Sequence, residues 1–301
     1  MHTIVLAVFE FSRTAVSMCG ASAVLLLIAI WAAKGDIARV SGLDKIVALS
    51  NLCFAVPLAV FGAEHFAAAR GIMQIVPKFM PWPLFWTYLV GVALIAASLS
   101  IATRIQENWS GLLFGIMMFL FVAMMDLPGT LAKPHDRFNW TLMLREMSFG
   151  AGGWVLAGSA MREQSLGQGK KLITVGRIVI GIAAIFYGIE HFLHPVNVPG
   201  VPLEKFMPLW IPGRLVIGYL TGAILVIAGA CILLGKKIRM AATYLGAWIF
   251  LLVVFIYGPI LIAGLADPST DVKVEGLNYF FDTLLYAGTI LAVASATPRT
   301  D

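Results

Sequence analysis

The sequence predicts an all-α integral membrane protein made of two tandem four-helix units in parallel orientation, preceded by one extra helix. Two observations carry this prediction. Sixty per cent of the 301 residues are hydrophobic and only 12% are charged, a composition outside the usual range of soluble domains. In addition, one polar motif occurs twice, each time at the end of a long apolar run.

Nine apolar segments are long enough to cross a membrane, because a helix needs about 20 residues to span about 30 Å of hydrocarbon. They are 14–33, 46–66, 84–103, 110–127, 141–160, 172–192, 214–234, 240–263 and 278–296. The first could be a cleaved signal sequence, but residues 1–10 lack the basic segment of such a signal. We therefore expect about nine transmembrane helices.

The repeated motif divides the chain. The hexapeptide FGAEHF at 61–66 returns as YGIEHF at 187–192, and the tetrapeptide KFMP follows each copy. Two units are predicted, 45–165 and 166–301, after an N-terminal helix and basic loop at 1–44. Four helices return the chain to the same side of the membrane, so the copies are expected to be related by an axis along the membrane normal.

The charges predict the orientation in the membrane. The chain has 21 Lys and Arg against 16 Asp and Glu, a net charge of +5. Most basic residues lie in tight loops on one side, which topology explains better than a nucleic-acid partner does. The positive-inside rule then predicts an inner-membrane protein with its N-terminus outside and its C-terminus in the cytoplasm. These basic residues are Lys34, Arg39, Lys45, Arg104, Arg162, Lys170, Lys171, Lys236, Lys237, Arg239 and Arg299.

The two Glu-His pairs are the candidate catalytic residues. Ionisable groups at the end of a membrane helix are costly unless they are paired, hydrated or used. A carboxylate and an imidazole there could bind the oxygens of a lipid-soluble quinone and exchange protons with it. Equally, the glutamates could pair with Arg145 or Arg214 and only hold the helices together. The pairs are Glu64 with His65 and Glu190 with His191.

Further polar and aromatic residues are predicted at the same membrane level, beneath proline-rich loops at 67–82 and 193–213 that would act as rigid caps. We expect a shallow amphipathic pocket under each cap. The candidate cofactor-binding residues are Arg145, Glu146, Arg214, Asp282, His194, Trp82 and Trp210.

Other cofactors find little support in the sequence. Glu190, His191 and His194 have helical spacing, but the first copy has Ala68 or Ala69 where a third metal ligand would be needed. No metal or haem is therefore expected. No nucleotide-binding fingerprint occurs, and the three cysteines do not form a Cys-x-x-Cys pair.

A four-helix membrane unit in which Gly-x-Glu-His-Phe closes one helix and Lys-Phe-Met-Pro precedes the next resembles the DoxX/DoxD-like superfamily, over about 45–297. That resemblance implies quinone-linked redox work beside a redox protein partner, as in the membrane subunits of archaeal thiosulfate:quinone oxidoreductase. Distant relatives act in maturation or as cargo receptors and assembly chaperones, so a non-enzymatic assembly factor for secreted or membrane clients is the alternative. The duplication and the first helix depart from the single-unit pattern.

Overall fold

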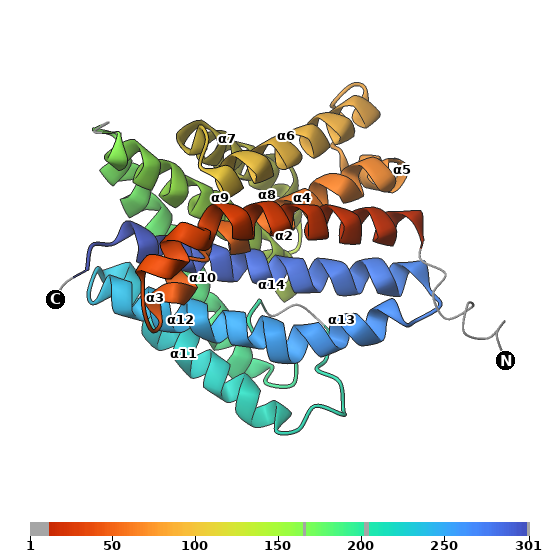
Figure 1. Ribbon diagram of the computed structural model, residues 1–301. Coiled ribbons are helices and arrows are strands. Elements are labelled where there is room, and N and C mark those ends of the chain that lie inside the picture. The colour runs from red at the N-terminus through yellow and green to blue at the C-terminus, as the bar shows by residue number, and fades with distance from the viewer. Residues whose placement is uncertain (1–11, 165–166, 202–204, 300–301) are drawn as a thin grey trace, which may run out of the picture.

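A computed structural model describes residues 12–164, 167–201 and 205–299, and it confirms the all-α class (Figure 1). The described residues contain no strand, and one isolated bridge joins Asn197 to Phe206. The helices are α2 (Arg13–Arg39), α3 (Asp44–Val47), α4 (Ser50–Ala67), α5 (Ala69–Ile72), η1 (Met73–Ile75), α6 (Pro83–Thr103), α7 (Glu107–Phe121), η2 (Val122–Asp126), α8 (Leu127–Ala132), α9 (Arg137–Glu163), α10 (Gly169–Leu193), α11 (Arg214–Leu234), α12 (Ile238–Leu252), η3 (Val253–Tyr257), α13 (Gly258–Leu265) and α14 (Thr270–Ala296).

The protein is a multi-pass membrane protein. In the described part of the chain, eight helices or joined helices are long and apolar enough to span a bilayer. The ninth predicted segment, 141–160, is α9, which has 27 residues but is less apolar. It carries Arg145 and Glu146 inside the bundle, and these charged residues lower its hydropathy.

Two helices extend furthest beyond their predicted segments. The segment predicted at 14–33 continues to Arg39, and the one predicted at 278–296 begins at Thr270. In both cases the additional turns carry charged residues, which lower the hydropathy but fit a helix end that reaches water. The extension of α14 matters most, because it adds two polar turns to the end of the bundle that holds the Glu-His motifs.

The helix pairings of the first unit recur in the second. Within the units, α4 packs on α6 as α10 packs on α11, and α7 packs on α9 as α12 packs on α14. Between the units, α4 packs on α14 and α9 packs on α10. The first and last helices of each unit therefore form the centre of the molecule. Helix α2 lies outside this arrangement against α4, and it begins at the opposite end of the bundle from the end of α14 (Figure 1).

Local features repeat as well. The π-helical turns η2 and η3 occupy corresponding places and are followed by Pro128 and Pro259. The Gly of each motif packs against the next helix: a Cβ on Gly62 would lie 2.6 Å from Ile95 Cγ1, and one on Gly188 would lie 2.5 Å from Val226 Cγ2. Close approach of this kind is the usual role of small residues between membrane helices.

The contact between the units depends on Gly288. A Cβ there would lie 2.6 Å from the Phe54 backbone nitrogen of α4, so Gly288→Ala must push the two central helices apart. We expect a loss of about 1–3 kcal/mol, seen as a lower melting temperature in detergent. Gly20→Ala in α2 is the control, because a Cβ there meets nothing within 4 Å. Equal melting temperatures for the two variants would show that this contact does not limit stability.

Candidate functional site

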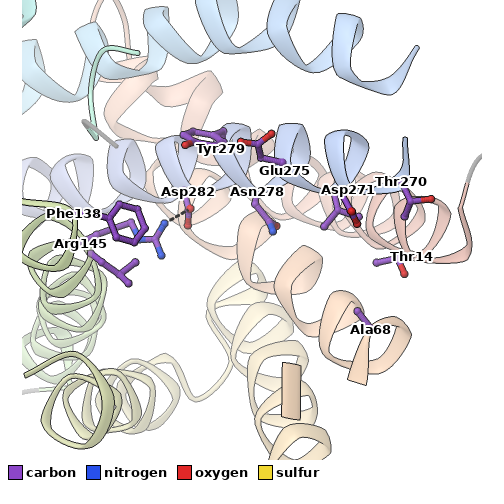
Figure 2. Close-up of a pocket in the computed structure, with 12 residues that line it drawn as sticks. Thr14, Ala68, Phe138, Arg145, Thr270, Asp271, Glu275, Asn278, Tyr279 and Asp282 are labelled. Atoms are coloured by element: carbon purple, nitrogen blue, oxygen red, sulfur yellow. Dashed lines mark hydrogen bonds and ion pairs between the residues drawn. The ribbon is translucent and has the colours of Figure 1, made fainter. Parts of the chain in front are cut away.

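A cavity of about 640 Å³ opens at the end of the bundle where α14 begins (Figure 2). We call this the cavity end. Residues of α2, α9 and α14, together with the residue that follows α4, line the cavity. They are Thr14, Ala68, Phe138, Leu142, Arg145, Thr270, Asp271, Val274, Glu275, Asn278, Tyr279 and Asp282.

Helix α14 supplies the polar wall. Asp271, Glu275, Asn278 and Asp282 follow one another at intervals of three or four residues, so they share one face of the helix (Figure 2). Glu275 also accepts from the Lys205 ammonium at 2.8 Å. The polar stripe thus runs from the rim of the cavity at Asp271 to its floor at Asp282.

The floor is an ion pair between the two units. The Nη1 of Arg145 on α9 donates to Oδ2 of Asp282 on α14 at 2.5 Å, and the two side chains are only 16% and 13% exposed. Two charges in such a place are tolerated when each compensates the other. Arg145 and Asp282, both predicted from the sequence, therefore meet at the site.

Glu64 lies beside this floor and has an amide partner. Asn278 donates through Nδ2 to Glu64 Oε1 at 3.1 Å. The alternative in which Glu64 pairs with Arg145 does not occur, because Arg145 pairs with Asp282, and Glu64 has no salt bridge among the described residues. A neutral partner leaves the carboxyl of Glu64 without a countercharge.

His65 keeps one ring nitrogen uncommitted. Its Nδ1 lies 2.7 Å from the carbonyl oxygen of Phe61, which can only accept, so Nδ1 carries the hydrogen. The Nε2 atom is then an acceptor, and it has no hydrogen bond within the described residues. Neither Glu64 nor His65 lines the cavity directly: Glu64 contacts the lining residue Asn278, and the Cβ of His65 lies against Gly91 of α6.

The polar groups of the second Glu-His pair are engaged by partners within the protein. Arg137 donates through Nε to Glu190 Oε2 at 2.6 Å, and His194 Nε2 lies 4.0 Å from the same oxygen. His191 is 1% exposed, and both its nitrogens are engaged: Nδ1 donates to the Tyr187 carbonyl at 2.6 Å, and Nε2 accepts from the Gly200 amide at 3.0 Å. No nitrogen of His191 is left for a ligand.

The loop after α10 accounts for this closure. It supplies the amide that binds His191, and its Pro199 carbonyl accepts from the buried Tyr257 hydroxyl at 2.7 Å. Arg214, one of the two arginines named in the alternative of a structural pair, instead donates to the Met207 carbonyl at 3.1 Å. Glu190 does pair with an arginine, but that arginine is Arg137.

The two tryptophans lie at the surface. Trp82 is 74% exposed at the start of α6, Trp210 is 57% exposed in the loop before α11, and neither lines the cavity. Exposed tryptophans near helix ends are typical of the membrane interface. They therefore mark the edge of the bilayer at the cavity end.

Glu146 also lies away from the cavity lining. Its carboxyl is within hydrogen-bonding reach of Asp126, the last residue of the π-helical turn η2. The second oxygen of each carboxyl, Glu146 Oε2 and Asp126 Oδ2, is buried without a partner among the described residues. Both carboxyl groups also interact electrostatically with Arg145.

Sequence reasoning missed several residues of the site: Arg137, Phe138, Asp271, Glu275, Asn278 and Tyr279. The signal for those on α14 was the three-to-four-residue spacing of the polar stripe, which starts before the predicted helix at 278–296. Within the described residues, no group of three or more His, Cys, Asp and Glu side chains could hold a metal ion. No family model, curated protein or solved structure matches this chain.

Proposed function

We propose that the protein binds a quinone or a similar amphipathic molecule in this cavity, as the membrane subunit of a redox system. The observation that carries the proposal is the cavity itself. Its volume of about 640 Å³ falls within the roughly 300–1,000 Å³ of typical ligand sites, and it combines an apolar wall with a few convergent polar groups.

The charges around the cavity favour a neutral head group. Arg145 is compensated by Asp282, and Glu275 by Lys205, while Asp271 has no ion pair within the described part of the chain. An anion would meet this unbalanced carboxylate and would be repelled. A quinone carbonyl can accept from the guanidinium of Arg145 or the amide of Asn278, and a quinol hydroxyl can donate to a carboxylate.

The apolar wall suits the rest of such a molecule. Phe138 and Leu142 of α9 face the cavity together with Val274 of α14 and Ala68. An aromatic ring and three aliphatic side chains provide the contact surface that a quinone ring and the first part of its tail require. The exposed Trp82 and Trp210 support a position at the edge of the bilayer, within reach of a lipid-soluble ligand.

The difference between the two motifs supports a division of roles. In the first copy Glu64 contacts the cavity wall through Asn278 and His65 keeps an uncommitted imidazole nitrogen, whereas in the second copy Arg137 binds Glu190 and the Gly200 amide binds His191. We infer that Glu64 and His65 serve the ligand and that Glu190 and His191 hold the bundle together. The resemblance to the DoxX/DoxD-like superfamily agrees with this role, and a redox protein at the outer face of the inner membrane would supply the electrons.

The proposal is tested by filling the cavity. Leu142→Trp places a large ring where the ligand would lie, and Leu131→Trp is the matched control at a position 66% exposed and outside the cavity. With a short-chain benzoquinone as the probe, we expect Leu142→Trp to weaken binding at least about tenfold, or about 1.4 kcal/mol, and the control to bind like the parent.

Mass spectrometry of lipid-soluble molecules that copurify with the protein provides a second test. A quinone retained by the parent and the control, and lost from Leu142→Trp, is the expected result. If the parent neither retains a quinone nor binds the probe, and instead copurifies with a secreted or membrane protein, the assembly-factor alternative replaces the proposal.

A further inference from the structure

Behind the floor of the cavity, three carboxyl groups surround a single arginine. Arg145 interacts electrostatically with Asp282, Glu146 and Asp126, and Asp282 is its ion-pair partner at 2.5 Å. One guanidinium neutralises one carboxylate. Among the described residues, no salt bridge joins Asp126 or Glu146 to any cation.

The two remaining carboxyl groups lie close together. Asp126 and Glu146 are within hydrogen-bonding reach of each other, and an oxygen of each is buried without a partner. Two ionised carboxylates in that geometry repel, whereas one proton between them forms a hydrogen bond. The π-helical turn η2 brings Asp126 into this position, and such turns inside helices are frequent at functional sites.

A second feature points to the same place. The Tyr286 hydroxyl is fully buried, has no hydrogen-bond partner within the described residues, and lies one turn of α14 beyond Asp282. Its ring packs edge-on against Tyr187 of α10 at 5.6 Å, and Tyr187 itself interacts electrostatically with Arg145, Asp282 and Glu146. The Tyr286 hydroxyl therefore touches this cluster through Tyr187, and a buried hydroxyl can both donate and accept a hydrogen bond.

We propose that Asp126 and Glu146 share one proton, and that occupation of the cavity draws a further proton onto the cluster around Arg145. The second half of this statement rests on the proposed function. An apolar ligand displaces water from the cavity floor, and the ionised form of Asp282 then loses part of its solvation. The cluster compensates by binding a proton, so the ligand site has its own proton-binding site directly behind it.

The shared proton is tested without a ligand. Infrared spectroscopy detects the carbonyl stretch of a protonated carboxyl group, which an ionised carboxylate lacks. At neutral pH we expect this absorption in the parent, a smaller absorption in Glu146→Gln and in Asp126→Asn, and no change in Glu163→Gln. Glu163 is the control because it is exposed at the end of the same helix as Glu146. An identical absorption in the parent and both cluster variants would overturn the shared proton.

The coupling is tested by calorimetry with the short-chain benzoquinone in buffers of different ionisation enthalpy. Net proton uptake of up to about one per ligand is expected in the parent, and a value near zero in Glu146→Gln. Quinone binding without proton uptake in the parent would overturn the coupling and leave the proposed function intact. Absence of quinone binding would overturn the proposed function and the coupling together, and the infrared result would then decide the shared proton alone.

Discussion

Glu190→Gln is expected to lower the free energy of unfolding by about 2–4 kcal/mol, and Glu64→Gln by less than about 1 kcal/mol. Glu190 is 10% exposed and pairs with Arg137 at 2.6 Å, so the substitution removes the charge that compensates a half-buried guanidinium. At position 64 a glutamine oxygen can still accept from Asn278. Thermal unfolding of the two purified variants in the same detergent measures the difference.

The ligand should respond in the opposite order. The proposed function assigns the ionisable carboxyl of Glu64 to the ligand, so Glu64→Gln is expected to weaken benzoquinone binding about tenfold, or about 1.4 kcal/mol, although the glutamine can still accept from Asn278. Folded Glu190→Gln should bind like the parent, because neither Glu190 nor its partner Arg137 lines the cavity, whereas Glu64 contacts the lining residue Asn278. Equal stability losses with equal affinities in the two variants would contradict the division of roles between the two motifs.

Arg145→Met is the substitution expected to do the most damage. It leaves Asp282 at the floor of the cavity without its partner at 2.5 Å, and loss of one member of a buried ion pair typically costs about 3–5 kcal/mol. The double variant Arg145→Met with Asp282→Leu removes both charges, so most of the stability should return. The free energies of unfolding of the parent, both single variants and the double variant give the interaction energy between Arg145 and Asp282.

Benzoquinone binding by the parent, the two single variants and the double variant distinguishes a structural role of the ion pair from a role in ligand binding. The double variant is expected to be stable and yet to lose the benzoquinone, because its cavity floor offers neither the donor nor the carboxylate. A double variant that remains as unstable as Arg145→Met would show that the pair is not what stabilises this region. A stable double variant with parental affinity would place the head group elsewhere.

The fold was predictable because its determinants are local. Twenty apolar residues in a row define a membrane helix whatever surrounds them, and the predicted segment 214–234 coincides with α11. The repeated motif likewise predicts the repeated packing, since Gly62 and Gly188 make the same close approach to the next helix. The class of the protein and the order of its helices follow from these patterns.

The site was less predictable because hydropathy treats a polar helix end as a loop. Asp271 and Glu275 precede the predicted segment at 278–296, so they are not recognised as part of a spanning helix. Once the helix is extended to Thr270, they share a face with Asn278 and Asp282 and form one wall. A search for periodic polar stripes beside each apolar segment would have found it.

The choice of partners could not be derived from residue types. Arg137 begins α9 and Arg214 begins α11, and both helices pack on α10, so the packing of α9 against α10 selects Arg137 as the partner of Glu190. The Nε2 atom of His191 is occupied by a backbone amide of the following loop, that of Gly200, nine residues further along the chain. Two nearly identical hexapeptides thus acquire different surroundings from residues outside the motif that differ between the two units.

The first helix of each unit packs on the last helix of the other unit, and this arrangement bears on how the duplicated chain arose. Because α4 packs on α14 as α10 packs on α9, a single-unit precursor could have made the same contacts with a second copy of itself, as a symmetric dimer. In such a dimer every substitution occurs in both subunits, so two identical motifs cannot drift apart. Fusion of two genes into one chain removes that constraint, and the open surroundings of Glu64 and the closed surroundings of Glu190 are the divergence that this freedom permits.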